Sequence, residues 1–454
     1  MAGAKGFMDI EGLSSLVSAG QVDTVVLAIT DMQGRLQGKR FDARFFLDEV
    51  LSHAAEGCNY LLAVDVDMRT VGGYEVSSWD RGYGDFVMKP DKDTLRIIPW
   101  HPRSALCLAD VEWADSTPVR VSPRQVLRAQ VERLSELGLT ALCATELEFI
   151  VFSDSYEQAW SKAYRGLENA NRYNVDYSVL GTSRVEPLIH RIRAEMSGAG
   201  MSVESSKGEC NPGQNEIAFR YSGAIEKADE HVVFKTGAKE IAAQQGCSLT
   251  FMAKFDEREG SSCHIHMSLR DRDGGPALAG GGGSRTSALF EHFLAGQIAG
   301  IGSITLLLAP NVNSYKRFVR DSFAPTAVAW GYDNRTCAFR VIGHGESLRI
   351  ECRVPGADVN PYLALAGLIA AGIHGVQAGL ALEPELKGNA YAADAPRIPT
   401  SLPAAADLFG SSKLTRSWFG DDVVDHYLNM ARVELDAFGS AVTDWERFRC
   451  FERV

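Results

Sequence analysis

The stretch Glu209-Cys-Asn-Pro-Gly-Gln-Asn-Glu216 places two carboxylates on an apparent strand, and three further segments share this character. They are Glu146-Leu-Glu148, His264-Ile-His266 and Arg349-Ile-Glu351-Cys-Arg353. Within each of these three the ionisable residues stand two apart, and a β-strand directs such residues to the same face. The spacing therefore predicts that five carboxylates and one or two imidazoles converge on one surface of a sheet.

A surface this rich in carboxylates indicates bound cations. Carboxylates crowded together repel one another unless cations lie between them, and oxygen ligands with a little nitrogen suit Mg²⁺ or Mn²⁺. A single Glu-x-Glu pair is usually a solvated strand edge, so the inference depends on the whole set. We expect a site with several metal ions, built on a sheet.

The residues between these ligands agree with a strand that has one buried face. In Thr145-Glu-Leu-Glu-Phe-Ile-Val-Phe152 the intervening positions are apolar. Cys210, Cys263 and Cys352 each adjoin a proposed ligand. Alternation should point them away from the metals, and we expect them to be small apolar residues of the core.

The composition excludes several classes of function. The chain has 454 residues and a formal charge of −12, without basic runs, which argues against a nucleic-acid or acidic-membrane partner. Nine cysteines without metal-finger spacing, and no apolar signal segment, favour reduced thiols in the cytoplasm. The apolar stretch Tyr362–Leu382 is interrupted by His374 and Gln377, so we expect a buried helix, not a membrane span.

The pattern along the chain predicts two domains, at residues 1–115 and 116–454. The first should be small and β-rich, with a helix at 9–19 and a strand at Thr24–Thr30 that turns at Gln33-Gly34. In the larger domain, Ser122 and Pro123 should cap and open a helix that reaches about Leu137. The remaining expected elements are a strand at 141–152, a polar segment at 155–180, helices at 183–198 and 223–245, a glycine-rich hairpin tip at 280–283 and a mostly helical C-terminal third.

Taken together, these motifs resemble the glutamine synthetase family of type I over essentially the whole chain. The resemblance also includes Asn313-Ser-Tyr-Lys-Arg317, Ala329-Trp-Gly-Tyr-Asp-Asn-Arg335 and Asn360-Pro-Tyr362. It implies an α+β fold, with a small β-grasp N-terminal domain and a catalytic domain whose curved antiparallel sheet is flanked by helices. It also implies active sites between neighbouring subunits of a dodecamer of two stacked hexameric rings.

The resemblance assigns roles to individual residues. It implies two or three Mg²⁺ or Mn²⁺ ions per site, with Glu148, Glu209 and Glu216 holding the tighter ion, which faces substrate glutamate. The second ion, which bridges the phosphates of ATP, falls to Glu146, His264 and Glu351. Glutamate is assigned to Arg317, Arg353, Gly260 and His266, the transferring phosphoryl group to Arg335 and Arg340, and the nucleotide to Ser268, Arg349 and Glu204. For His266 a purely structural role stays open.

The departures from the family concern the acceptor of the glutamyl group. Ammonia-using members carry Glu-Ala-Pro at the end of a flap, where this chain has Asp321-Ser-Phe323-Ala-Pro325, and a phenyl ring cannot act as a base. The family's Asp-Gly-Ser-Ser loop, which a neighbouring subunit supplies, corresponds to Glu75-Val-Ser-Ser78, so Glu75 takes the catalytic position. The family's Asn-Gly before the histidines has become Glu259-Gly260.

We therefore expect an ATP-dependent ligase that joins the γ-carboxylate of glutamate to an organic primary amine through a γ-glutamyl phosphate. Phe323 would offer an apolar wall to the carbon substituent of that amine. Ethanolamine, polyamines, alkylamines and anilines all remain open. Two alternatives are a true glutamine synthetase that uses ammonium and a non-catalytic sensor of nucleotide or amine, although the intact ligand set speaks against a sensor.

Overall fold

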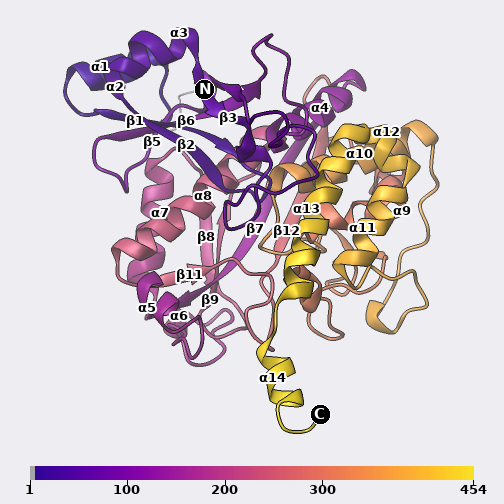
Figure 1. Ribbon diagram of the computed structural model, residues 1–454. Helices are drawn as coiled ribbons and strands as arrows, with labels where there is room; N and C mark the ends of the chain where they lie inside the picture. Colours follow the sequence, from indigo (N-terminus) through magenta and orange to yellow (C-terminus); the bar gives the residue numbers. More distant parts are fainter. Residues whose placement is uncertain (1–5) are drawn as a thin grey trace.

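The computed structural model describes residues 6–454 and contains two sheets that follow one another along the chain (Figure 1). The first sheet has the order β2-β1-β6-β4-β3, with β5 also paired to β6, and its neighbours β1 and β6 run parallel. Its strands are β1 Thr24–Thr30, β2 Leu36–Asp42, β3 Ala55–Cys58, β4 Asp85–Pro90, β5 Arg96–Ile97 and β6 Ser104–Glu112. Short helical segments within this region are α1 Ile10–Ser18, α2 Ala43–Phe45, η1 Phe46–Val50, α3 Leu51–His53, η2 Asn59–Leu62 and η3 Lys92–Thr94.

The second sheet has nine strands and forms the centre of the molecule. Its order is β13-β14-β15-β12-β7-β9-β8, with β10 and β11 also paired to β7, and all pairs are antiparallel except β13 with β14. The strands are β7 Thr140–Phe152, β8 Val203–Gly208, β9 Gln214–Phe219, β10 Ser222–Gly223, β11 Ser248–Thr250, β12 Cys263–Arg270, β13 Trp330–Tyr332, β14 Phe339–Ile342 and β15 Arg349–Cys352. The expected α+β fold with a curved antiparallel sheet and flanking helices is confirmed.

Helices pack around this sheet, and the last part of the chain is mostly helical, as expected (Figure 1). They are α4 Pro123–Glu136, α5 Tyr156–Ser161, α6 Val179–Thr182, α7 Glu186–Gly198, α8 Ala224–Gln244, α9 Ala288–Leu308, η4 Val312–Arg317, η5 Gly345–Ser347, α10 Pro361–Ala378, η6 Ala390–Ala392, α11 Leu402–Ser411, α12 Lys413–Phe419, α13 Asp421–Ser440 and α14 Asp444–Cys450. Within the described residues, α9 and α10 are long and apolar enough to cross a membrane, and both are mostly buried. The prediction of a buried helix from residue 362 is therefore confirmed.

Glycines let α9 and α10 lie against each other at short range. A Cβ on Gly296 would lie 2.2 Å from the carbonyl oxygen of Ala371, and one on Gly375 would lie 2.1 Å from that of His292. Any side chain at either position would push the helices apart, because the obstacle is backbone. These two helices thereby form a thick apolar layer beside the sheet.

Helix α4 begins as expected, with Ser122 at its N-cap and Pro123 as its first residue, although the Ser122 side chain makes no capping hydrogen bond. Other local predictions need correction. The helix expected at 183–198 begins at Glu186, because Pro187 fixes its first turn and the separate helix α6 precedes it. Glu209 and Cys210 lie beyond the end of β8, in a turn where Gln214 N donates to Asn211 O at 2.8 Å.

One hydrophobic core extends across both sheets, and a buried arginine also joins their two regions. Arg124 of α4 is ion-paired with Asp91 and Asp110 of the first region, each at 2.7 Å, and with Asp229 of α8 at 2.9 Å. The charge is buried with three carboxylate partners, so removing it would leave unpaired buried anions. The division of the chain near residue 115 remains a prediction.

Candidate active site

The register of the central sheet brings the predicted ligands onto one face. β7 pairs with β12 on one side and β9 on the other, and β15 and β8 continue the row outward. The paired residues are Glu146 with His264, Glu148 with Glu216, His266 with Glu351, Arg340 with Glu351, and Lys207 with Glu216. Since cross-strand partners project to the same side, charged groups from six strands meet there.

Glu148, Glu209 and Glu216 form the first group of ligands. One carboxylate oxygen from each lies within 4.8 Å of the others. Burial, followed by the charge of Glu209, raises the pKa of Glu148 to about 8, and burial with the charges of Glu146 and Glu148 raises the pKa of Glu216 well above its usual value. Ionising these carboxyl groups together costs free energy when no cation is present. A hard divalent cation would favour their charged forms, so the group fits such a cation.

Glu148 is oriented by hydrogen bonds that leave one of its oxygens available. Its Oε2 accepts from Ser262 N at 2.7 Å and from Gln214 Nε2 at 3.0 Å. Its Oε1 has no hydrogen-bond partner among residues 6–454. The backbone and an amide thus hold the carboxylate in place while the second oxygen stays free for a ligand.

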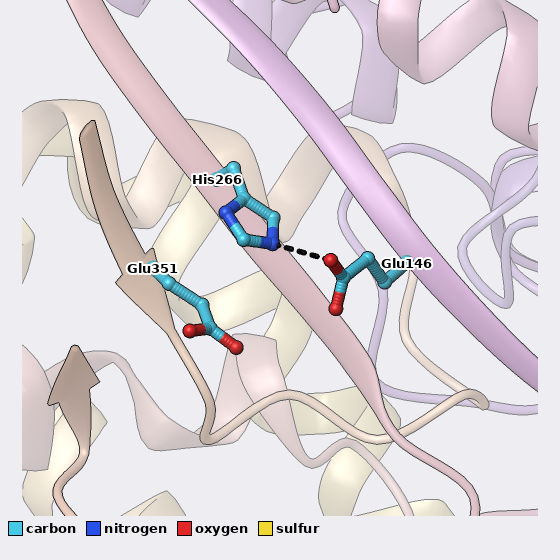
Figure 2. Close-up of side chains that lie close together, drawn as sticks. All are labelled: Glu146, His266 and Glu351. Carbon is cyan, nitrogen blue, oxygen red and sulfur yellow. Dashed lines mark ion pairs between the residues drawn. The ribbon is translucent and has the colours of Figure 1, made fainter. Parts of the chain in front are cut away.

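Glu146, His266 and Glu351 form the second group, and Figure 2 shows their side chains pointing toward one another from β7, β12 and β15. Glu146 Oε1 lies 2.9 Å from His266 Nε2, and its Oε2 lies 3.2 Å from Nδ1 of His264. His264 Nδ1 also lies 3.6 Å from Glu351. Both imidazoles therefore border this group, and which one takes the metal-ligand role implied by the resemblance stays a prediction.

The carboxyl groups of the second group have lowered pKa values, in contrast to those of the first group. Burial tends to raise the pKa of Glu146, but hydrogen bonds with His264 and His266 outweigh it and hold that pKa low. Burial lowers the pKa of His264 to about 4. A neutral imidazole beside ionised carboxylates is the form in which histidine binds a metal, so this group also fits a divalent cation.

Of the arginines predicted to contact glutamate or the phosphoryl group, two bind Glu351 of the second group and two do not. Arg340 Nη1 donates to Glu351 Oε2 at 3.1 Å, and Arg353 Nη1 donates to the other oxygen of Glu351. Arg317 is buried, and its two Nη groups donate to the carbonyls of Arg353 and Val354 at 2.8 Å. Arg335 is exposed and makes no ion pair within the part of the chain that the structure describes.

Gly260 gives Arg317 the room it needs. A Cβ on Gly260 would lie 2.5 Å from Cγ of Arg317 and 2.6 Å from the carbonyl oxygen of Ala253. Its carbonyl also accepts from Gln214 Nε2 at 3.0 Å, and Gln214 orients Glu148. Gly260 is therefore positioned to support the first group through its neighbours, while its contact with glutamate stays a prediction.

A cavity of about 290 Å³ opens beside the second group. Its lining includes Glu146, His266 and the three residues predicted to contact the nucleotide, Glu204, Ser268 and Arg349. Arg349 Nε lies 3.3 Å from Nδ1 of His266, which links the guanidinium to the ligand group. A larger hollow of about 580 Å³ between α4 and α12 contains none of the predicted site residues.

Phe323 and Glu75 belong to neither ligand group. Phe323 is 57% exposed on the segment after η4 and has a positive φ of 59°. Its carbonyl accepts from Nη2 of Arg353 at 3.4 Å, so the backbone is tied to the site while the ring is left open. Glu75 is exposed, and within the described chain its carboxylate makes no hydrogen bond or ion pair with either group.

Sequence reasoning missed Lys207, whose ammonium group borders the first group. Lys207 Nζ pairs with Glu209 and lies 3.3 Å from Asp176 Oδ1. Its position two residues before Glu209 was the available signal. Cys210 was also placed wrongly. Cys263 and Cys352 are buried as expected, but Cys210 is only partly buried, with its Sγ 3.6 Å from Asp176 Oδ2, because it lies in a turn and not in a strand.

Comparison with known proteins finds relatives that match most of the chain. Gamma-glutamylethanolamide synthetase GlnA4 of Streptomyces coelicolor is 64% identical over 447 residues, which cover 98% of this chain and 96% of the relative. A glutamate–isopropylamine ligase of a Pseudomonas species is 36% identical, covering 95% and 96% of the two chains. A glutamine synthetase of Mycobacterium bovis is 33% identical, covering 80% and 84%. The first two of these relatives are thus named for amides of glutamate with organic amines.

A solved structure shares the fold. The GmaS/ADP complex superposes with a TM-score of 0.85 at 24% identity, covering 97% of this chain and 99% of the other. Residues 120–450 match the family model described as glutamine synthetase, catalytic domain. With this match and the extent of the 64% identity, the chain belongs to the glutamine synthetase family.

Proposed function

We propose that this chain is an ATP-dependent ligase that joins the γ-carboxylate of glutamate to a small primary amine, with ethanolamine as the first candidate. The observation that carries this proposal is the combination of two intact ligand groups with a flap that presents the ring of Phe323 instead of a carboxylate. The name of the 64% identical relative supports ethanolamine among the amines that the sequence leaves open.

Enzymes of the glutamine synthetase family use ATP and divalent metals, and this chain has the residues to hold both. Glu148, Glu209 and Glu216 would hold one Mg²⁺ or Mn²⁺, and Glu146 and Glu351 with His264 or His266 would hold a second. The bound cations would supply positive charge beside the phosphates of the nucleotide and beside the reacting carboxylate.

The protein's own side chains would orient both substrates. Glu204, Ser268 and Arg349 line the cavity that suits the nucleotide, and Arg353, close to Phe323, suits a carboxylate of glutamate. Arg340 and Arg335 would stabilise the phosphoryl group in transfer. A γ-carboxylate oxygen would attack the terminal phosphorus as ADP leaves. The amine nitrogen would then attack the acyl carbon, phosphate would leave with the bonding electrons, and the nitrogen would lose a proton.

Phe323 bears on the second step. An ammonium ion must lose a proton before it can attack, and a phenyl ring provides neither a base nor an ion pair. A primary amine gains from contact between its carbon atoms and the exposed ring. The second candidate function is glutamine synthesis from ammonium, which the mycobacterial relative favours.

An acceptor screen decides between these candidates. ADP release should be measured with glutamate and either ammonium, ethanolamine, propylamine, 1,3-diaminopropane or aniline, and the product identified by mass spectrometry. The proposal predicts γ-glutamylethanolamide, with kcat/KM for ethanolamine well above that for ammonium. Preference for ammonium over every amine would make the chain a glutamine synthetase, and no turnover with any acceptor would favour a sensor.

We also propose a homo-oligomer, with the dodecamer as the form that the family resemblance implies. Glu75 is exposed, and among residues 6–454 its carboxylate makes no hydrogen bond or ion pair with the ligand groups, which suits a site completed by a neighbour. In Figure 1, α14 extends away from the body of the molecule, with Trp445, Phe448 and Phe451 exposed. Exposed aromatic residues of this kind often mark subunit contacts. All nine cysteines are free thiols, which supports the proposed cytoplasmic location.

A further inference from the structure

The candidate site has two ends, which lie at different positions along strands β7, β8 and β9. The cavity that suits the nucleotide meets β8 at Glu204, β7 between Leu142 and Glu146, and β9 at Ala218 and Phe219. The register row of Lys207, Glu216 and Glu148 crosses the same three strands farther along, beyond the cavity. An acceptor that attacks the acyl carbon must approach from the side away from the nucleotide. Lys207 therefore lies on the acceptor side.

The ammonium group of Lys207 is enclosed by three neighbours. It pairs with Glu209 and lies 3.3 Å from Asp176 Oδ1, and it lies 4.5 Å from the centre of the Tyr177 ring. Lys207 and Asp176 keep about a quarter and a third of their side-chain surface exposed. A cation between two carboxylates and an aromatic face is held in position, yet it remains accessible to a small molecule.

The loop that carries Asp176 is anchored to the sheet. Val175 is fully buried and packs against two glycines. A Cβ on Gly208 would lie 2.5 Å from the carbonyl oxygen of Val175, and a Cβ on Gly181 would lie 2.6 Å from Cγ1 of Val175. Asn171 Nδ2 donates to Gly181 O at 2.8 Å, and Asp176 N donates to Asn174 Oδ1 at 2.8 Å. The carboxylate of Asp176 is thus presented to Lys207 by a fixed backbone.

We propose that Lys207, held between Asp176 and Glu209, determines the amine specificity of the ligase proposed above, on whose function this inference rests. The end of the amine opposite its nucleophilic nitrogen would meet a fixed positive charge paired with a carboxylate. A hydroxyl group suits that pair, because it accepts from the ammonium and donates to Asp176. A second ammonium is repelled by Lys207 and finds Asp176 already paired. The acceptor class is a small hydroxyl-bearing monoamine, not a diamine.

Lys207→Met tests this inference, because Met has a similar length and no charge. With the full-length protein, kcat/KM should be measured for ethanolamine, propylamine and 1,3-diaminopropane. The ratio of kcat/KM for ethanolamine over propylamine should fall about tenfold. The ratio of kcat/KM for ethanolamine over the diamine should fall about ten- to a hundredfold, because the variant loses both a hydrogen bond to ethanolamine and the repulsion of the diamine. The change should appear in KM for the amine, while KM for ATP stays constant.

Lys162→Met is the matched control. Lys162 also pairs with an aspartate, Asp154, at 2.6 Å, but it belongs to neither ligand group, so both ratios should remain at the wild-type values. Asp176→Asn gives a second test in case Lys207→Met does not fold, and it should also lower the preference for ethanolamine over propylamine.

Two outcomes separate this inference from the proposed function. An equal loss for all three amines in the folded variants would mean that Lys207 only orients Glu209, which overturns the inference and leaves the ligase proposal intact. A wild-type protein that forms no γ-glutamyl amide would overturn both. A changed ratio in the two variants, with unchanged ratios in the control, supports the specificity role.

Discussion

Glu148→Gln should inactivate the enzyme and yet stabilise the cation-free protein. The amide preserves the packing, because both Ser262 N and Gln214 Nε2 donate to the same oxygen of Glu148, and the single oxygen of the new amide can accept both bonds. What the substitution removes is one ionisable carboxyl group from the set that also contains Glu209 and Glu216. The variant therefore tests electrostatics with little change in shape.

The size of the effect follows from the pKa of Glu148, which burial and the charge of Glu209 raise from 4.5 to about 8. A carboxyl group with a raised folded pKa adds stability that is complete below pH 4.5 and is lost as the pH rises through about 8. At pH 7 the folded protein must hold a proton that the unfolded chain has released. Two and a half pKa units at about 1.36 kcal/mol each make this cost roughly 3 kcal/mol, and the Glu148→Gln variant avoids it.

Thermal unfolding between pH 5 and 9, in EDTA and in Mn²⁺, measures this directly. In EDTA the melting temperature of wild type should fall as the pH rises, and Glu148→Gln should melt higher than wild type at pH 7 to 8. In Mn²⁺ at a thousandfold excess over its Kd the order should reverse, because the bound cation then adds about 4.1 kcal/mol to wild type and the variant lacks one ligand. A variant less stable than wild type in EDTA would refute the raised pKa of Glu148, and an equal gain from Mn²⁺ in both proteins would refute the assignment of this group to a metal.

Three further predictions concern the acceptor, the nucleotide and the assembly. Phe323→Glu should lower the ratio of kcat/KM for propylamine over ammonium by roughly ten- to a hundredfold, because the new carboxylate pairs with ammonium and faces apolar carbon; an unchanged ratio would show that residue 323 does not face the acceptor. Arg349→Gln should raise KM for ATP at least about tenfold, because a charged contact with a phosphate is lost, while KM for glutamate stays constant. Initial-rate kinetics measures both constants. A parallel rise in both would argue against a nucleotide role for Arg349. If Glu75 completes the site of a neighbouring subunit, Glu75→Gln and Glu216→Gln chains should each be inactive alone. Oligomers mixed from the two variants should recover part of the wild-type activity. Mixtures as inactive as their components would contradict a shared site.

The sequence was a good guide wherever side chains alternate between a core and an active face. Val25, Leu27 and Ile29 of β1 are buried, as the strand expected at Thr24–Thr30 requires. The same period placed Glu146 and Glu148 on one face of β7, and the register across the sheet then brought their partners to them. A strand face with several buried carboxylates predicts a site, because the carboxylates repel one another unless cations or arginines lie beside them.

Alternation does not distinguish two residues that share a face. His264 and His266 both point to the site, and their contacts with Glu146 follow from side-chain rotamers that no periodic pattern contains. The contacts of Arg317 were hidden for another reason. Its motif predicts a substrate contact, which stays a prediction, and in the structure both of its Nη groups donate to backbone carbonyls 36 and 37 residues away in sequence. Only the tertiary structure shows such a long-range partner.

The contact between Lys207 and Asp176 lies at the limit of what the sequence could predict. Lys207 is on a strand with a regular period, but Asp176 is in a loop without one, and 31 residues separate them. The buried Val175 and the two glycines beside it determine that they meet, because the loop fits the sheet only where those glycines leave room. Most of the proposed metal ligands follow the period of the sheet, whereas the contact between Lys207 and Asp176 depends on one loop. The acceptor preference of such an enzyme can therefore change through the loop while the metal site remains the same.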